Sequence, residues 1–250
     1  MKKLILALCL ALSSSVVFAG AGGGCGELPK CDQAPVDLRN KESLQHGAQL
    51  FMSYCSGCHS AKYLRYERMA QDLDIDPKLV EKYLMFAADK IGDPIDSKVN
   101  LKDQAKWFGN APPDLSLETR FRSPDWVYTY LLNFYPDDKR PWGVNNRVFK
   151  DVGMPHVLDP LEQQLGPEDF EAAVGDLVNF MTYMAEPSRV TRENMGVWVL
   201  LFLALLMVPV YLLNKEFWKD KGGRLNRCRP FVFFVVRRVS SWQPLRVALQ

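Results

Sequence analysis

The sequence contains little histidine, little net charge and no internal repeat. Three histidines stand among 250 residues, and 31 basic residues nearly balance 29 acidic ones, which leaves a formal charge of +2. Binding to nucleic acid usually needs a clear basic patch or stripe, so the composition does not indicate a nucleic-acid partner. No segment shows convincing alternation of apolar and polar residues, which argues against a β-rich fold. The length suits one or two domains.

The N-terminus has the three parts of a secretory leader. Lys2 and Lys3 precede an apolar run over residues 4–12, and a small-residue site follows near Ala19. This pattern predicts a signal peptide over residues 1–19, which directs the following residues out of the cytoplasm. A buried N-terminal helix is the alternative.

A second apolar run, over residues 195–213, contains no charged residue and is long enough to cross a bilayer as a helix. Pro209 lies inside it, and membrane helices tolerate proline. Six basic residues follow the run: Lys215, Lys219, Lys221, Arg224, Arg227 and Arg229. Positive charge collects on the cytoplasmic side of a span, so we expect a cytoplasmic C-terminus and an exported domain before the span. A buried helix of a soluble domain is the alternative.

These two segments predict four parts of the chain. The parts are a signal peptide (1–19), an exported domain (20–188), a transmembrane anchor with its basic flank (189–221) and a tail without an assigned role (222–250). Start signals such as Asp-Pro and Ser-Pro-Asp predict helices within the exported domain. The predicted helices cover residues 43–54, 76–91, 123–134 and 167–185, with a long loop over 135–166.

The strongest local signal is the C-x-x-C-H motif of Cys55, Cys58 and His59. Three interpretations compete. A redox dithiol would open a helix in a βαβ setting, which this chain does not suggest. A zinc site needs four ligands, and the other exported cysteines and histidines have spacings that fit no common zinc pattern: Cys25, Cys31, His46 and His156. Attachment of one haem c needs only thioethers from the two motif cysteines and His59 as proximal ligand, so the motif favours haem.

Electron transfer by a haem iron favours a sixth ligand, and methionine opposite histidine raises the reduction potential and closes the iron. Met154 lies in the long loop between Gly153 and Pro155, where a fixed turn can present its sulfur. His156 is a rival ligand. The other candidates are Met69, Met85, Met181 and Met184, and the last two fall on a predicted helix, where methionine usually packs in the core.

A proline segment and two arginines are further candidates. Pro112 and Pro113 impose an extended backbone on the stretch NAPPDLS, and Arg120 and Arg122 follow it. Arginine pairs bidentately with carboxylates, and the propionates of a haem are carboxylates. A linker is the alternative for the proline segment. A solvated surface charge is the alternative for both arginines, and it is the favoured one for Arg122.

Four stretches together resemble the cytochrome c1 family: GAQLFMSYCSGCHSAKYLRY, APPDLS, GMPHVL and FMTYMAEPSRVTRENMG, followed by a single C-terminal anchor. The resemblance covers about residues 32–220. It implies an all-α fold, with a class I cytochrome c-like haem domain that has loop insertions, plus one C-terminal transmembrane helix. In that fold the first helix crosses the last one near Gly47.

The resemblance also implies the site. The thioether cysteines fall on Cys55 and Cys58, the proximal ligand on His59, the distal ligand on Met154, and a propionate-pairing arginine on Arg120.

The implied function is that of the electron-transfer subunit of the cytochrome bc1 complex, a ubiquinol:cytochrome c oxidoreductase, without a catalytic residue of its own. The haem would take an electron from the Rieske iron–sulfur protein and pass it to cytochrome c, beside cytochrome b in the bacterial inner membrane, with the haem domain in the periplasm. A membrane-anchored monohaem cytochrome serving another oxidase or reductase is the alternative. An enzyme or sensor would instead need an open sixth position.

Two features depart from the family. Cys25 and Cys31 are exported and close in sequence, which permits a local disulfide. Residues 222–250 continue past the family's usual end, and their apolar stretch 230–236 is too short to span a bilayer. A membrane-surface segment and an altered reading frame are the two accounts of this tail.

Overall fold

The computed structural model describes residues 24–219, which belong to two units with a boundary after Thr191. We describe each unit by itself. The predicted signal peptide (1–19) and the tail (222–250) lie outside the described residues.

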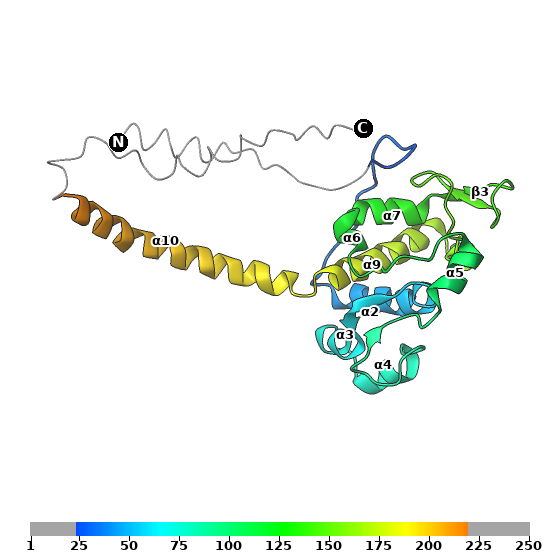
Figure 1. Cartoon of the computed structure of the whole chain (residues 1–250), viewed down its shortest axis with the longest axis horizontal. Coiled ribbons are helices and arrows are strands. Elements are labelled where there is room, and N and C mark those ends of the chain that lie inside the picture. The colour runs from blue at the N-terminus through cyan, green and yellow to red at the C-terminus, as the bar shows by residue number, and fades with distance from the viewer. Residues whose placement is uncertain (1–23, 220–250) are drawn as a thin grey trace, which may run out of the picture. The chain divides into compact units, whose positions relative to one another are not determined.

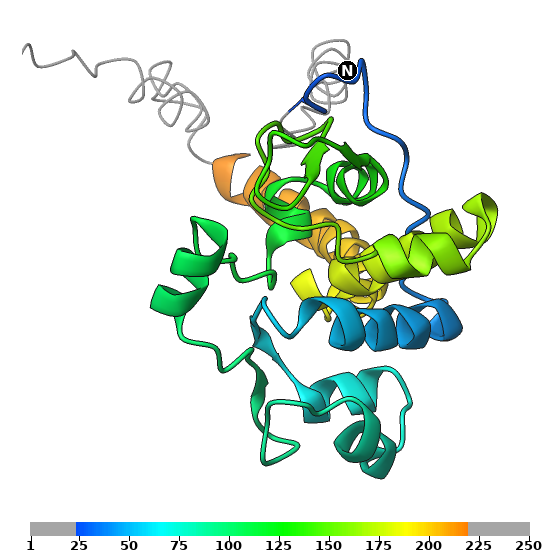
Figure 2. The ribbon, with the colours of Figure 1, turned by 90° about the vertical axis from the view of Figure 1, so that its right-hand side faces the viewer.

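The first unit is mainly helical, as predicted (Figures 1 and 2). Its helical elements are α2 (Lys41–Leu50), the π-helical turn η1 (Phe51–Cys55), α3 (Tyr66–Asp72), α4 (Pro77–Tyr83), α5 (Leu101–Phe108), α6 (Glu118–Phe121), α7 (Pro124–Leu132), α8 (Asp159–Gln164) and α9 (Pro167–Ala185). Two short antiparallel pairs, which we did not expect, join β1 (Ala61–Arg65) to β2 (Pro94–Ile95) and β3 (Phe134–Pro136) to β4 (Val144–Asn146). Strands this short leave no visible alternation in the sequence.

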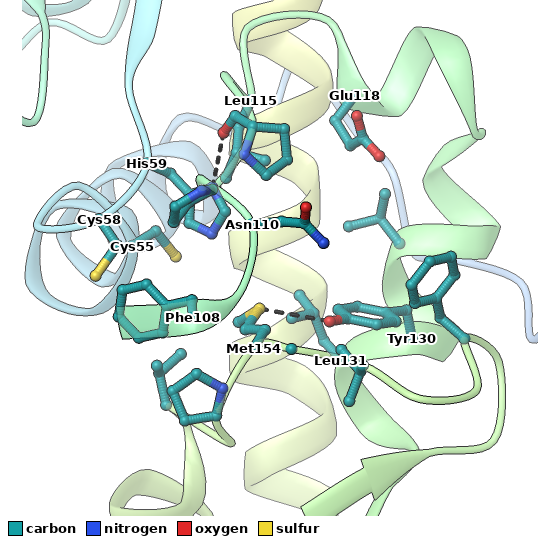
Figure 3. A pocket seen from close by; sticks show the side chains of 18 of the residues that line it. Cys55, Cys58, His59, Phe108, Asn110, Leu115, Glu118, Tyr130, Leu131 and Met154 are labelled. Atoms are coloured by element: carbon teal, nitrogen blue, oxygen red, sulfur yellow. Dashed lines mark hydrogen bonds between the residues drawn. The ribbon is translucent and has the colours of Figure 1, made fainter. Parts of the chain in front are cut away.

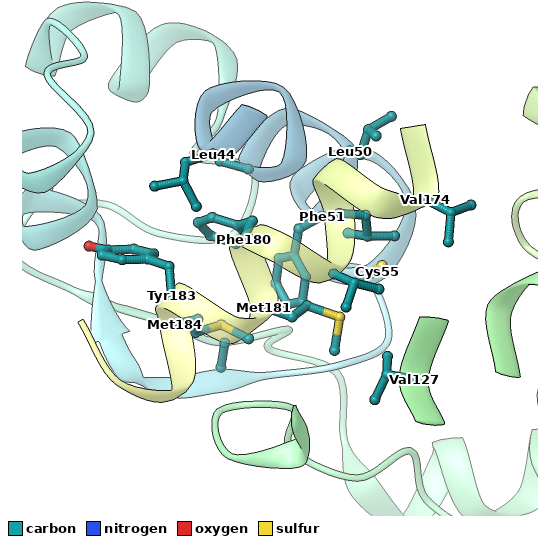
Figure 4. Packing of buried hydrophobic residues seen from close by; sticks show 14 of the residues in the cluster. Leu44, Leu50, Phe51, Cys55, Val127, Val174, Phe180, Met181, Tyr183 and Met184 are labelled. Atoms are coloured by element: carbon teal, nitrogen blue, oxygen red, sulfur yellow. The ribbon is translucent and has the colours of Figure 1, made fainter. Parts of the chain in front are cut away.

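The centre of the core is the crossing of α2 with α9, in keeping with the resemblance (Figure 4). A Cβ at Gly47 would overlap the carbonyl oxygen of Asp176 and lie 2.8 Å from the Cβ of Phe180, so the two backbones meet at closest approach here. The rings of Phe51 and Phe180 pack 5.6 Å apart just beyond this point. The close approach therefore places the end of α2, where the C-x-x-C-H motif begins, against the most buried helix.

The predicted helices differ from the observed ones in one important place. The prediction for α9 agrees with its observed bounds, and those for α2 and α7 agree to within a few residues. The helix predicted over 76–91 was wrong, because α4 ends at Tyr83. Farther on, the carboxylate of Asp93 accepts hydrogen bonds from the amides of Asp89 and Lys90. Such local side-chain bonds offer the backbone an alternative to the helix.

Helix α10 (Arg189–Lys219) supplies the described residues of the second unit, and its most apolar stretch of 18 residues has a mean hydropathy of 2.5. Its 31 residues contain the whole predicted span 195–213, and Pro209 lies inside the helix without ending it. Within residues 24–219, α10 is the one helix long and apolar enough to cross a membrane.

Candidate haem-binding site

A cavity of about 360 Å³ lies where the end of η1, the proline segment, α7 and the long loop meet. It brings together four of the five predicted site residues: Cys55, Cys58, His59 and Met154. Figure 3 shows the two cysteines and His59 coming from one side of the cavity and Met154 from a separate loop. Residues separated by almost a hundred positions in the sequence therefore face one space.

The two motif cysteines are free thiols at the end of the π-helical turn. The amides of Cys58 and His59 both donate to the carbonyl of Cys55, which coils the motif into one tight turn. Burial, with a smaller effect of the neighbouring Cys58, raises the pKa of Cys55 to about 12. A redox dithiol requires the opposite shift, toward thiolate, so this environment does not favour the dithiol interpretation.

The structure does not favour a zinc site, because two of the candidate ligands are bonded to each other. Cys25 and Cys31 form a disulfide with their Cα atoms 5.4 Å apart, which also confirms that the local pairing is sterically suitable. Across residues 24–219, no group of three or more His, Cys, Asp or Glu side chains could hold a metal ion. The motif thiols therefore lack the further ligands that a structural zinc site needs.

The imidazole of His59 is held from the proline segment. Its Nδ1 lies 2.8 Å from the carbonyl oxygen of Pro113, so Nδ1 carries the proton and donates, which leaves the Nε2 lone pair available to a metal (Figure 3). Burial lowers the pKa of His59, an effect that the bond to Pro113 partly opposes. A neutral imidazole with an oriented ring is the form that binds iron. Pro113 is thus a wall of the site rather than part of a linker.

The side chain of Met154 lines the cavity from the long loop. The hydroxyl of Tyr130 on α7 donates to its Sδ at 3.4 Å. The rival His156 does not line this cavity, since its ring stacks on Phe134 with centroids 4.7 Å apart. Met181 lines the cavity as well, but it is buried in the core on α9. The other candidates, Met69, Met85 and Met184, are absent from the lining.

Comparison with known proteins decides the family. Residues 32–221, three quarters of the chain, match the cytochrome C1 family. The chain belongs to the cytochrome c1 family. It is 45% identical to the cytochrome c1 of Allochromatium vinosum over 88% of this chain and 99% of that protein. It is also 40% identical to the ammonia monooxygenase gamma subunit of Nitrosomonas europaea, over 78% of this chain and 90% of that protein. The cytochrome c1 of Rhodobacter capsulatus is 24% identical, over 89% and 99%.

Membership of the cytochrome c1 family makes the chain an electron-transfer subunit of the bc1 complex, an oxidoreductase. The family implies a covalently attached haem c, and the residues fit that group. Two free thiols, one neutral imidazole and the thioethers of Met154 and Met181 line a single cavity whose walls are largely apolar and aromatic. Helix α10, which among residues 24–219 is long and apolar enough to cross a membrane, makes the chain a membrane-anchored member of the cytochrome c1 family.

The two candidate arginines differ in their position relative to the cavity. Arg120 is exposed and is absent from the cavity lining, whereas Arg122 lines the cavity. The Arg122 guanidinium donates to the carboxylate of Glu118 at 2.8 Å and lies 4.3 Å from the ring centroid of Trp126. Arg122 is therefore not a plain solvated charge. The pairing of Arg120 with a propionate stays a prediction from the cytochrome c1 resemblance.

Sequence reasoning missed the aromatic wall of this cytochrome c1-family site. Trp126 and Tyr130 stack with their rings 5.2 Å apart and 8° from parallel, and both line the cavity beside Phe149. Their signal was present, because two aromatics four residues apart share one face of the predicted helix 123–134. Phe108, at the end of α5, also lines the cavity, and no local pattern marks it.

Proposed function

We propose that this chain carries one haem c, which Cys55 and Cys58 would bind covalently and whose iron His59 and Met154 would ligate. The observation that supports the proposal is that all four side chains line one cavity although two separate elements supply them. When bound, the haem supplies a one-electron couple. Histidine and methionine ligation is typical of cytochromes that transfer electrons and not of those that activate small molecules.

The residues of the chain have three tasks in this function. The carbonyl of Pro113 holds His59 in one tautomer, and the hydroxyl of Tyr130 holds the sulfur of Met154. The aromatic wall excludes water, and a dry, apolar surrounding helps to set the potential of a haem. No protein group has to gain or lose a proton for the electron to pass.

We further propose the partners and the location. The chain takes an electron from the Rieske iron–sulfur protein and passes it to cytochrome c, while α10 anchors it beside cytochrome b. The predicted leader and the basic residues after the span support a bacterial inner-membrane location, with the haem domain in the periplasm and the C-terminus in the cytoplasm.

A second candidate is an anchored monohaem cytochrome that serves another oxidase or reductase. Its support is the similarity to the protein named ammonia monooxygenase gamma subunit. A tagged chain purified from native membranes in mild detergent distinguishes the two. We expect a reduced-minus-oxidised spectrum with bands of both c-type and b-type haem. A c-type spectrum without co-purified b-type haem would favour the second candidate.

The sixth ligand has its own test. Met154→Ala should lower the reduction potential and allow the reduced protein to bind carbon monoxide, because the iron loses its thioether. An unchanged potential and spectrum would show that a group other than Met154 is the sixth ligand. If the native protein also bound carbon monoxide, the chain would instead be a ligand-binding haem protein.

A further inference from the structure

The segment that carries Met154 follows β4 and has almost no regular structure. We call residues 147–154 the Met154 loop. It supplies Phe149, Val152 and Gly153 to the cavity as well as the methionine. Backbone amides that are not paired in a helix or sheet need other partners when they are buried. In this loop, the amides of Val148, Phe149 and Asp151 bond the side chains of residues that precede it.

Asn146 is the first of these partners, and its side chain is buried, with the residue 1% exposed. Its Oδ1 accepts from the amides of Val148 at 2.9 Å and Phe149 at 3.1 Å. Its Nδ2 donates to the carbonyl of Tyr130 at 2.7 Å. One side chain therefore turns the start of the loop and ties it to α7.

Asn145 and Arg140 hold the second half of the loop. The Oδ1 of Asn145 accepts from the amide of Asp151 at 2.9 Å, and its Nδ2 donates to the carboxylate of Asp137 at 2.9 Å. The guanidinium of Arg140 donates to the carbonyls of Asp151 at 2.7 Å and Val152 at 3.0 Å. These bonds support a turn in which Asp151 has a φ of +61°, a conformation that most residues avoid.

Tyr130 is bonded both to Asn146, before the Met154 loop, and to the methionine at its end. Its carbonyl receives the bond from Asn146, and its hydroxyl donates to the sulfur of Met154. Gly153 is packed so closely that a Cβ there would lie 2.9 Å from the carbonyl of Phe108. The backbone just before the sulfur is thus bonded or packed at successive points, and a ligand needs that degree of placement to bind a metal well.

We propose that Asn146, with Asn145 and Arg140, forms a positioning network that sets the place of the Met154 sulfur and thereby controls how firmly the sixth ligand is held. The inference rests on the proposed ligation by Met154. None of the three side chains touches the cavity, since none belongs to its lining. They act through the backbone of the Met154 loop.

Asn179 provides a matched control. It is also a buried asparagine, 0% exposed, with three hydrogen bonds. It accepts from the amide of Asp37 at 3.1 Å and donates to the carbonyl of Asp37 and the hydroxyl of Ser43, both at 2.9 Å. It therefore has the same chemistry and burial as Asn146, but it holds the segment before α2 and not the Met154 loop.

The experiment compares Asn146→Ala, Asn179→Ala and Met154→Ala with the parent protein, each as the full chain purified in detergent from native membranes. We measure the midpoint potential of the c-type haem, the fraction of reduced c-type haem that binds carbon monoxide, and the thermal midpoint. We expect Asn146→Ala to lower the potential and to raise the carbon monoxide-binding fraction at least tenfold, toward the value of Met154→Ala. Asn179→Ala should lower the thermal midpoint and leave both haem readouts at the parent values.

Equal haem readouts for Asn146→Ala and Asn179→Ala would overturn the proposal, because the effect would then follow from general destabilisation. Parent values for Asn146→Ala would overturn it too. Arg140→Met is the second variant if Asn146→Ala does not accumulate, since the Arg140 side chain is 24% exposed and its loss is better tolerated. The same direction of change is expected, and parent values would again refute the network. If Met154→Ala left the midpoint potential and the carbon monoxide-binding fraction at the parent values, Met154 would not be the ligand. This outcome distinguishes failure of the proposed ligation from failure of the proposed network.

Discussion

The two sides of the cavity, which carry His59 and Met154, are built by different physical means. His59 follows a continuous helical stretch, α2 and η1, which packs on α9 through apolar side chains such as Phe51 and Phe180. The Met154 loop has no such helix, and side-chain amides and a guanidinium satisfy its backbone. Apolar packing is non-directional and distributed, whereas a hydrogen-bond network fails when one member is lost. We therefore expect the His59 side to respond to changes in shape, and the Met154 side to respond to single polar groups.

The largest effect should come from Gly47→Ala. The new methyl group would overlap the carbonyl oxygen of Asp176, which is backbone and cannot rotate away. We expect a loss of about 3 kcal/mol in the free energy of unfolding, the upper end of the usual cost of overpacking. Chemical denaturation followed by Soret circular dichroism measures it. Gly92→Ala, where a Cβ meets nothing within 4 Å, is the control. Equal stability of the two variants would mean that the α2–α9 crossing is looser than described.

Removal of the Cys25–Cys31 disulfide should have the next largest effect on the free energy of unfolding, and it should act on the Met154 side of the cavity. The amide of Glu27, inside the Cys25–Cys31 loop, donates to the carbonyl of Arg147 at 2.9 Å. The Cys25→Ala/Cys31→Ala variant should lose about 2 kcal/mol, as expected for a disulfide that closes a short loop. Hydrogen exchange should accelerate at the amide of Glu27. A reductant should lower the thermal midpoint of the parent protein and not that of the variant. If the reductant lowered the thermal midpoint equally in the parent protein and the variant, the assignment of a Cys25–Cys31 disulfide would be contradicted.

Tyr130→Phe should have a smaller effect, which appears in the potential. With Met154 as the proposed iron ligand, the hydroxyl of Tyr130 would draw electron density from its sulfur and make the sulfur a poorer donor to oxidised iron. Its loss should lower the potential by the equivalent of about 1 kcal/mol, the usual net contribution of one hydrogen bond. Tyr128→Phe on the same helix is the control, because its hydroxyl bonds to the carbonyl of Glu171. An equal change in reduction potential in Tyr128→Phe would show that the bond from Tyr130 to Met154 does not set the potential.

The smallest effect concerns the pH dependence of stability on the His59 side. The hydroxyl of Ser60 donates to Asp96 at 2.7 Å and, with help from Lys62, holds the pKa of that carboxyl below 3.8. A carboxyl with a lower pKa in the folded state stabilises the protein above pH 3.8 and loses that contribution as the pH falls through the folded-state pKa. Asp96→Asn should therefore show a shallower decline of the thermal midpoint between pH 5 and 2.5. Parallel curves for parent and variant would contradict this account.

The features that sequence alone predicted are those whose cause is local. The C-x-x-C-H motif holds three site residues within five positions, and α9 has a Gly-Pro-Glu-Asp start and a continuous apolar face. The helix predicted over 76–91 was too long because the sequence does not show that the carboxylate of Asp93 bonds the amides of Asp89 and Lys90, which lie beyond the end of α4. Tyr130 and Asn146 were missed because their partners come together only when α7 and the Met154 loop meet in the fold.

The length of α10 has a consequence for the way in which the helix can cross a bilayer. At about 1.5 Å per residue, its 31 residues extend for roughly 46 Å. The uncharged residues 195–213 account for about 28 Å, close to the roughly 30 Å hydrocarbon core of a bilayer. Six residues remain at each end, or about 9 Å, which exceeds the roughly 5–8 Å of one headgroup layer. The helix is therefore long enough to cross the hydrocarbon core and both headgroup layers of a bilayer.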